Sequence, residues 1–343
     1  MHMEDENFTD TRVRPKKDRA FSGTSKYRQN HKLNSKLPAA DIPDSLTAEY
    51  ARIVFVDTET TGLSFETDRI TELSAILARG GSWSPKDTDT YMDAYIKLPK
   101  GVTISEEAKK ACPIRRGVLT RYGIPEKDAL LQFIELAFND GFEAPDLPDI
   151  PDGFTFPESA KRREYAGKEP NGYEDRRVLF IGHNIHFDMN MILAACRRCN
   201  IEFPDCWDVL DTLSIFRDRH KYPHKLEAAL DVFGIRDAKN SHLSFDDVWA
   251  VVRLLDALDK ERKDLQEYVN LLGYPKKYGD PGFHLPRCTY LSQEMNRTLD
   301  DPTIYDENAR QLMLKREAQK EAEAEMRAVL EMYEEDEGTN LKK

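Results

Sequence analysis

Short runs of apolar residues, separated by polar turns, outline the fold along this chain. Residues 53–56 are β-branched or aromatic, which is typical of a buried strand. Similar patterns predict further strands at 69–79, 89–98, 178–181 and 206–209. Apolar residues at helical spacing predict helices at 104–111, 126–139, 225–233 and 246–272. Two more helices are expected, one that begins around Asp188 and one that begins near Asp211. A group of strands followed by alternating strands and helices indicates an α/β fold around a mixed sheet.

The pattern divides the chain into a folded region and two extensions. Residues 1–48 are polar and lack sustained periodicity, so we expect a disordered basic arm. Residues 49–272 form the expected domain, in which the proline-rich stretch 140–176 is an inserted loop. Residues 273–343 begin as a linker rich in proline and glycine and continue as a charged helix from about residue 306 to 335. We therefore expect one domain with an extension at each end.

Composition fits a cytoplasmic protein with a packed core. The chain has 343 residues, of which 40% are hydrophobic and 33% are charged. It contains no run of about 18 or more apolar residues, so we expect no membrane span. Its five cysteines form a sparse, odd-numbered set that fits reduced thiols rather than a disulfide framework. These features predict a cytoplasmic location and no membrane partner.

Charge is distributed unevenly along the chain. The net charge of −12 excludes a general basic coat for nucleic acid. Residues 11–37 nevertheless carry nine Lys or Arg against one Asp, while residues 317–337 carry nine acidic residues against two basic ones. Phe21 and Tyr27 lie in the basic stretch, a mixture that can hold phosphates and stack on bases, although a solvated tail fits equally. The acidic stretch fits either a solvated surface or a helix that binds a partner.

Two carboxylates follow the first predicted strand. Asp57 and Glu59 are two residues apart, so their side chains project to the same side of an extended strand. Mutual repulsion makes such a pair costly unless a positive charge lies between them. A divalent cation bound by oxygen ligands could supply this positive charge. The alternative is that both acids are solvated at the surface and need no cation. We favour the cation site.

Two later stretches deliver further acids to the start of a helix. Asp188 follows the predicted strand 178–181, and taken alone it fits helix capping. Asp247 lies in the first turn of another predicted helix, shortly after His242, and its neighbour Asp246 could cap that helix. Each stretch is weak evidence by itself. Together with the strand-borne pair, they supply four carboxylates and one imidazole.

In order and local context, these residues resemble the DnaQ-like, or DEDDh, 3′-to-5′ exonucleases, a family that includes the proofreading epsilon subunit of bacterial DNA polymerase III. The resemblance covers roughly residues 50–260 and rests on Phe-Val-Asp-Thr-Glu-Thr-Thr-Gly-Leu (55–63), Gly-His-Asn-Ile-His-Phe-Asp (182–188) and His-Leu-Ser-Phe-Asp-Asp (242–247). It implies a ribonuclease H-like fold, with a mixed central β-sheet flanked by helices. The chain departs from the family in a longer interval between its first two motifs.

The resemblance also implies roles for individual residues. Two Mg²⁺ or Mn²⁺ ions would be held by the four catalytic carboxylates Asp57, Glu59, Asp188 and Asp247. His242 is the expected general base, because a neutral imidazole can accept a proton from water at neutral pH. Substrate-binding residues are expected beside the motifs, namely Thr58, Thr60, Leu63, Asn184 and Phe187.

We therefore expect a metal-dependent 3′-to-5′ exonuclease that releases nucleoside 5′-monophosphates from single-stranded 3′ ends of DNA, in proofreading or repair. An exoribonuclease of the same fold stays open, because the motifs do not decide how the 2′-hydroxyl is recognised. A non-catalytic nucleic-acid-binding or scaffold module is a third possibility, against which the complete set of five key residues argues. A DNA polymerase or another replication protein could bind through residues 273–343.

Overall fold

The structure is a computed structural model that describes residues 37–79, 81–87, 89–138 and 177–340. From residue 328 onward it describes only the backbone of the last helix. The predicted insertion, residues 140–176, lies outside the described residues, as does residues 1–36 of the predicted basic arm. Both remain predictions.

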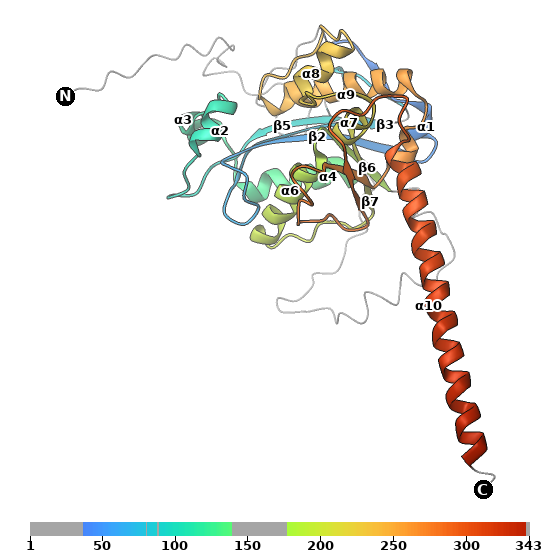
Figure 1. Ribbon diagram of the computed structural model, residues 1–343. Coiled ribbons are helices and arrows are strands. Elements are labelled where there is room, and N and C mark those ends of the chain that lie inside the picture. Colours follow the sequence, from blue (N-terminus) through green and yellow to red (C-terminus); the bar gives the residue numbers. More distant parts are fainter. Residues whose placement is uncertain (1–36, 80, 88, 139–176, 341–343) are drawn as a thin grey trace.

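A mixed sheet of seven strands forms the centre of the molecule (Figure 1). Its strands are β1 (Ala40–Asp41), β2 (Arg52–Thr60), β3 (Ile70–Arg79), β4 (Ser82–Trp83), β5 (Tyr91–Tyr95), β6 (Val178–Gly182) and β7 (Trp207–Asp211). The order is β1-β4-β3-β2-β6-β7, and β5 also pairs with β3. β2 is antiparallel to β3 and parallel to β6, which is in turn parallel to β7. The predicted α/β class, a mixed central sheet flanked by helices, is confirmed.

Helices cover both faces of this sheet (Figure 1). The α4 (Glu126–Phe138) and α6 (Ile185–Cys199) helices pack on one face, and α7 (Thr212–Arg219), α8 (Leu226–Val232) and α9 (Ser244–Glu261) pack on the other. Shorter helices complete the body: α1 (Asp44–Thr47), α2 (Glu106–Ala111), α3 (Arg116–Tyr122) and the 3₁₀ helix η2 (Leu265–Tyr268).

The β2 strand contributes side chains to both layers in strict alternation. Ile53 and Phe55 pack against α9 in one core cluster, while Val54 and Val56 join the cluster beneath α4 and α6. All four are fully buried, which explains why the sequence shows a continuous apolar run rather than a half-polar pattern. The same alternation continues past Val56, and it therefore determines the face of the sheet on which Asp57 and Glu59 project.

The fold begins earlier than residue 49. Ala40 and Asp41 pair with β4, and the side chain of Leu46 is fully buried in the core under α9. The sequence underestimated this part because one buried leucine and a two-residue strand are too short to give a periodic pattern.

The stretch between residues 262 and 293 also differs from prediction. The helix expected over 246–272 ends at Glu261, and a two-stranded parallel sheet follows, made of β8 (Leu271–Pro275) and β9 (Thr289–Gln293). Leu272 and Leu285 are buried in the core cluster beneath α6. The proline- and glycine-rich segment is therefore packed onto the domain and is not a free linker.

The predicted charged helix is present as α10 (Ile304–Asn340). Ile304 is fully buried, and the Tyr305 hydroxyl donates to Asp264 Oδ2 at 3.2 Å, which fixes the start of the helix. Beyond this first turn, α10 extends away from the body (Figure 1).

Candidate active site

Asp57 and Glu59 stand at the end of β2, on the face that carries Phe55 and α9. Asp57 lies opposite Ser74 of β3, and Glu59 lies opposite Glu72. The β2–β3 pairing becomes irregular after Glu59, where the chain leaves the sheet for a turn. The strand thus delivers both carboxylates to the same side, as the two-residue spacing predicts.

Asp188 reaches this pair from the first turn of α6. Its Oδ1 atom accepts two hydrogen bonds from Thr58, one from the backbone N at 2.8 Å and one from the hydroxyl at 2.7 Å. Asn184 occupies the N-cap position, and Asp188 does not cap the helix. The backbone N–H of Asn184 instead donates to Asp211 Oδ1 at 2.7 Å. Capping therefore does not explain Asp188, which faces the strand-borne acids.

His242 lies in the loop before α9, and Asp247 lies in the first turn of that helix. The Asp247 carboxylate accepts hydrogen bonds from Ser241 N at 3.0 Å and from Asn240 Nδ2 at 3.3 Å, so the loop wraps around it. His242 itself has a positive φ of 53° and an exposed side chain. Asp246, the alternative cap, instead accepts a hydrogen bond from Ser241 Oγ at 2.5 Å.

The three motifs converge on one site. One ligand atom from each of Glu59, His242 and Asp247 lies within 4.8 Å of the others. Burial raises the pKa of Asp57 well above its usual range, and the nearby charges of Asp188, Asp247 and Glu59 raise it further. The structure thus brings the five predicted catalytic and metal-binding residues together, while their individual roles remain predictions.

Crowding also shifts the other carboxyls of the site. Burial raises the pKa of Glu59 to about 7, with a hydrogen bond from the Cys112 thiol opposing the shift. Burial raises the pKa of Asp188 to about 7 against the two hydrogen bonds from Thr58. The pKa of Asp247 rises to about 8, mainly through burial and with a contribution from the charge of Glu59. Without a counter-charge, this pocket holds protons that ordinary carboxyls release near pH 4.

A buried polar layer beneath the site was not predicted from the sequence. Glu72 Oε2 accepts a hydrogen bond from Ser244 N at 3.0 Å, at the start of α9. The hydroxyls of Ser74 and Ser244 lie 2.5 Å apart, and Ser74 Oγ donates to Asp93 Oδ1 at 3.1 Å. These contacts tie the helix that carries Asp247 to the strand beside β2. In the sequence, Glu72 inside the otherwise apolar β3 strand was the feature that could have indicated this polar layer.

The five predicted substrate-binding residues lie in the two motifs that carry Asp57, Glu59 and Asp188. The Thr58 hydroxyl is engaged with Asp188, and Thr60 Oγ1 donates to Gly62 O at 2.7 Å within the turn. The side chain of Leu63 is 80% exposed at the tip of this turn. Across the site, Asn184 lines a cavity, and the Phe187 ring lies 5.7 Å from the ring of Phe65. These positions suit substrate contact, which remains a prediction.

The donor set fits divalent metal ions. Carboxylate oxygens are the ligands that Mg²⁺ and Mn²⁺ prefer. Burial is the main cause of the raised pKa values of Asp57, Glu59, Asp188 and Asp247, and repulsion from neighbouring carboxylates adds to it for Asp57, Asp188 and Asp247. Cations bound among them would remove that repulsion.

Comparisons with known proteins return exonucleases. No family profile matches the chain. A curated relative, Exonuclease DPD1, chloroplastic/mitochondrial, from Arabidopsis thaliana, is 24% identical over 219 residues, which cover 62% of this chain and 57% of the relative. Among solved structures, the chain is similar to E. coli exonuclease I in a zinc-bound complex with single-stranded DNA, with a TM-score of 0.46, 15% identity and coverage of 64% of this chain and 42% of that one. Exonuclease I from Methylocaldum szegediense gives a TM-score of 0.42, 17% identity and coverage of 62% and 41%.

The chain spans about half the length of these relatives. Among the residues with described structure, none of the helices has the length and apolar character needed to cross a membrane.

Proposed function

We propose that this protein is a divalent-metal-dependent 3′-to-5′ exonuclease that hydrolyses phosphodiester bonds at single-stranded 3′ ends of DNA. The observation that carries the proposal is the convergence of four carboxylates and one histidine, drawn from three separate motifs, on the end of β2. The name of the curated plant relative agrees with this chemistry.

In the proposed reaction, Asp57, Glu59, Asp188 and Asp247 hold two Mg²⁺ or Mn²⁺ ions. Such ions lower the pKa of bound water and neutralise charge that develops on the scissile phosphate and the departing 3′ oxygen. His242 accepts the proton of the attacking water, and its exposed position next to Glu59 and Asp247 gives it access to solvent for releasing that proton. The product is a nucleoside 5′-monophosphate.

The finer parts of the proposal concern substrate and setting. We favour DNA and a proofreading or repair role in the cytoplasm, by resemblance to the epsilon subunit, with a polymerase or replication protein bound through residues 273–343. The protruding α10 helix offers such a partner an accessible surface. Trimming of RNA is the second candidate, because the carboxylate site acts on the phosphate and leaves the sugar undetermined.

Parallel digestion of three substrates tests the proposal. End-labelled single-stranded DNA, a mismatched primer–template and single-stranded RNA are incubated with Mg²⁺ and, separately, with chelator. We expect Mg²⁺-dependent shortening of both DNA substrates from their 3′ ends. Digestion of RNA alone would instead assign the protein to the exoribonucleases, and the absence of any digestion would favour a scaffold.

A further inference from the structure

Residues 274–290 form a fixed wall beside α6, the helix whose first turn carries Asp188. The Tyr290 hydroxyl lies 2.7 Å from His186 Nδ1 and accepts a hydrogen bond from Leu285 N at 3.0 Å. Asn190 Nδ2 donates to Phe283 O at 3.3 Å, which ties a second point of the segment to the same helix. The His284 ring stacks on Tyr290 with ring centroids 4.0 Å apart. The segment is therefore held in place before any ligand binds.

A row of aromatic rings leads along this wall from the site. Phe187, next to Asp188 in the chain, contacts Phe65 at 5.7 Å, and Phe65 contacts Phe283 at 5.3 Å. The outermost ring, Phe283, is 54% exposed although large apolar side chains are usually covered. The row thus connects the carboxylate site to a ring that is open to solvent.

A second exposed ring stands on the same segment. Tyr278 is 72% exposed and borders a cavity of about 240 Å³ together with Asn184, His186, Tyr274 and Tyr290. Asn184 is the N-cap residue of α6, the helix whose first turn carries Asp188. The cavity therefore lies beside the start of α6, and aromatic side chains share its lining with Asp211, Asp280 and Arg217.

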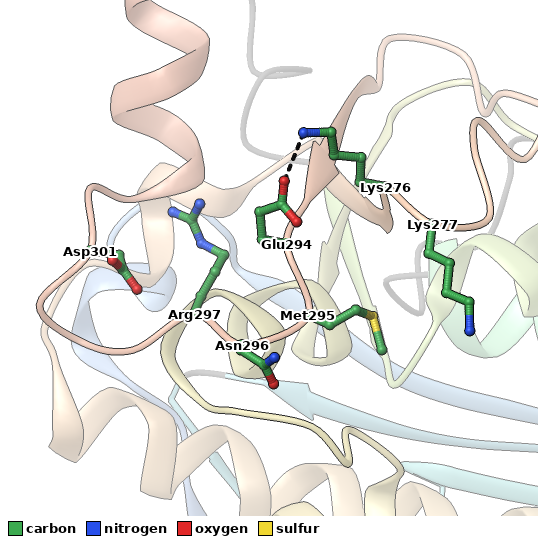
Figure 2. A pocket seen from close by; sticks show the side chains of 7 residues that line it. All are labelled: Lys276, Lys277, Glu294, Met295, Asn296, Arg297 and Asp301. Carbon is green, nitrogen blue, oxygen red and sulfur yellow. Dashed lines mark hydrogen bonds and ion pairs between the residues drawn. The ribbon is translucent and has the colours of Figure 1, made fainter.

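Positive charge accompanies these rings. Lys277 Nζ lies 5.3 Å from the centroid of the Tyr278 ring. Figure 2 shows Lys276 turned toward Glu294, with which it pairs at 2.8 Å, whereas Lys277 points away from this pair. Residues 271–290 contain three Lys or Arg and one Asp in a chain whose net charge is −12. This segment is a local exception to the acidic character of the protein.

The neighbouring cavity of about 490 Å³ in Figure 2 is itself lined by Lys277, together with Lys276 and Arg297. Its Arg297 side chain is bound by Asp218 at 2.8 Å and by Glu307 at 2.9 Å, so its charge is already neutralised. Lys277 lines the same cavity and also lies beside the Tyr278 ring.

We propose that Tyr278, Phe283 and Lys277 form a track for single-stranded nucleic acid, on the 5′ side of the nucleotide that occupies the carboxylate site. This inference rests on the proposed function, which places the 3′ end among the carboxylates. Exposed rings stack on bases of any sequence, and a lysine beside one of these rings can contact a phosphate. A preformed wall avoids the cost of ordering a loop when the strand binds.

Binding of labelled strands to the full chain, in chelator to prevent hydrolysis, tests the track. The probes are 15-nucleotide oligodeoxythymidine and oligouridine, followed by fluorescence anisotropy. We expect Tyr278→Ala and Phe283→Ala each to raise the Kd about tenfold, because base–ring stacking is lost. Tyr278→Phe retains the ring and should restore affinity. Lys277→Gln should reduce the slope of log K against log salt by about 0.7, as for one phosphate contact on a single strand.

The matched control is Tyr222→Ala. Tyr222 is another tyrosine with a largely exposed side chain (63%), and its ring contacts His224 rather than any ring of the track. Its truncation should leave the Kd unchanged, and circular dichroism should match the wild type in every variant. Unchanged Kd values for both Tyr278→Ala and Phe283→Ala, or an equal loss for Tyr222→Ala, would overturn the track.

Hydrolysis measured with Mg²⁺ separates the two proposals. If the variants bind weakly but the wild type hydrolyses no strand, the exonuclease proposal fails and the track stands. If the wild type hydrolyses strands and the track variants bind normally, the track alone fails. When both are right, the loss of kcat/KM in the track variants shrinks as the substrate is shortened toward a dinucleotide, because short strands do not reach Tyr278.

Discussion

Thr58 holds Asp188 with two hydrogen bonds, one from its backbone N at 2.8 Å and one from its hydroxyl at 2.7 Å, both to the same carboxylate oxygen. Thr58 lies between Asp57 and Glu59 in the first motif, and it orients Asp188, the acid of the second motif. Because these bonds favour the ionised form, they oppose the rise in the pKa of Asp188 that burial causes.

Replacing Thr58 by Val removes the hydroxyl but keeps a β-branched side chain of similar size. We expect Mg²⁺-dependent hydrolysis to fall about ten- to a hundredfold, the usual effect of losing a partner that orients a metal ligand. The apparent Mg²⁺ requirement should rise in the same assay. Thr58→Ser keeps the donor and serves as the control; if Ser and Val behave alike, the hydroxyl does not position Asp188.

Glu72 supports the helix that carries Asp247, through its hydrogen bond with Ser244 N. Glu72→Ala leaves that buried N–H without its acceptor, so we expect the free energy of unfolding to fall by about 1–3 kcal/mol. Activity should fall as well, because the start of α9 is no longer anchored. Glu72→Gln retains an acceptor and should lose much less of both. Chemical denaturation and initial rates, measured for the two variants side by side, check this difference.

Stability of the metal-free protein should decline as pH rises. In the folded state, burial raises the pKa of Glu59 and Asp188 to about 7 and that of Asp247 to about 8, and the charge of Glu59 adds to the rise for the two aspartates. Carboxyls of an unfolded chain titrate near about 4. The folded state therefore binds more protons between these values, and stability is lost as pH rises from about 4 to about 8.

Thermal unfolding in chelator, scanned from pH 5 to pH 8, measures this decline directly. Addition of Mn²⁺ or Mg²⁺ should raise the unfolding midpoint, and by more at pH 8 than at pH 5, because cations compete with protons for the same oxygens. A midpoint that is independent of pH in chelator would show that folding does not raise the pKa values of these carboxyls.

His242 offers a test of chemistry that is largely independent of folding, because its side chain is exposed. We expect His242→Ala to reduce kcat by about 10²–10⁴, the usual contribution of a general base, with little change in the unfolding midpoint. Lys221→Ala, at an exposed residue between α7 and α8, is the comparison. Equal turnover of His242→Ala and the wild type would remove this residue from the mechanism.

The carboxylate site could be predicted because its parts depend on local patterns. Asp57 and Glu59 follow a buried strand at alternating positions, and Asp188 and Asp247 each open a helix. Glu72 could not be assigned in this way, because its position beside Glu59 depends on the register between β2 and β3. A register of this kind is decided by long-range pairing that a single sequence does not display.

The region after α9 was predicted least well. Leucines at 265, 271 and 272 continue the apolar content of the helix, which favoured one long helix over 246–272. The chain instead turns after Glu261, and Asp264 forms a buried ion pair with Arg219 at 2.5 Å. The proline and glycine residues that followed indicated a linker, whereas Leu272 and Leu285 fold the segment onto the domain. Tertiary burial here outweighed local sequence preference.

The central claim is tested most directly by comparing the wild type with Asp57→Asn on a 5′-labelled single-stranded DNA. We predict that the wild type with Mg²⁺ shortens the label-bearing strand stepwise from its 3′ end and releases nucleoside 5′-monophosphates. Asp57→Asn should release none, while its unfolding midpoint in chelator at pH 8 equals or exceeds that of the wild type, because one repelling charge is gone. Near-normal turnover by Asp57→Asn, or equal digestion by the wild type in chelator, would contradict the account.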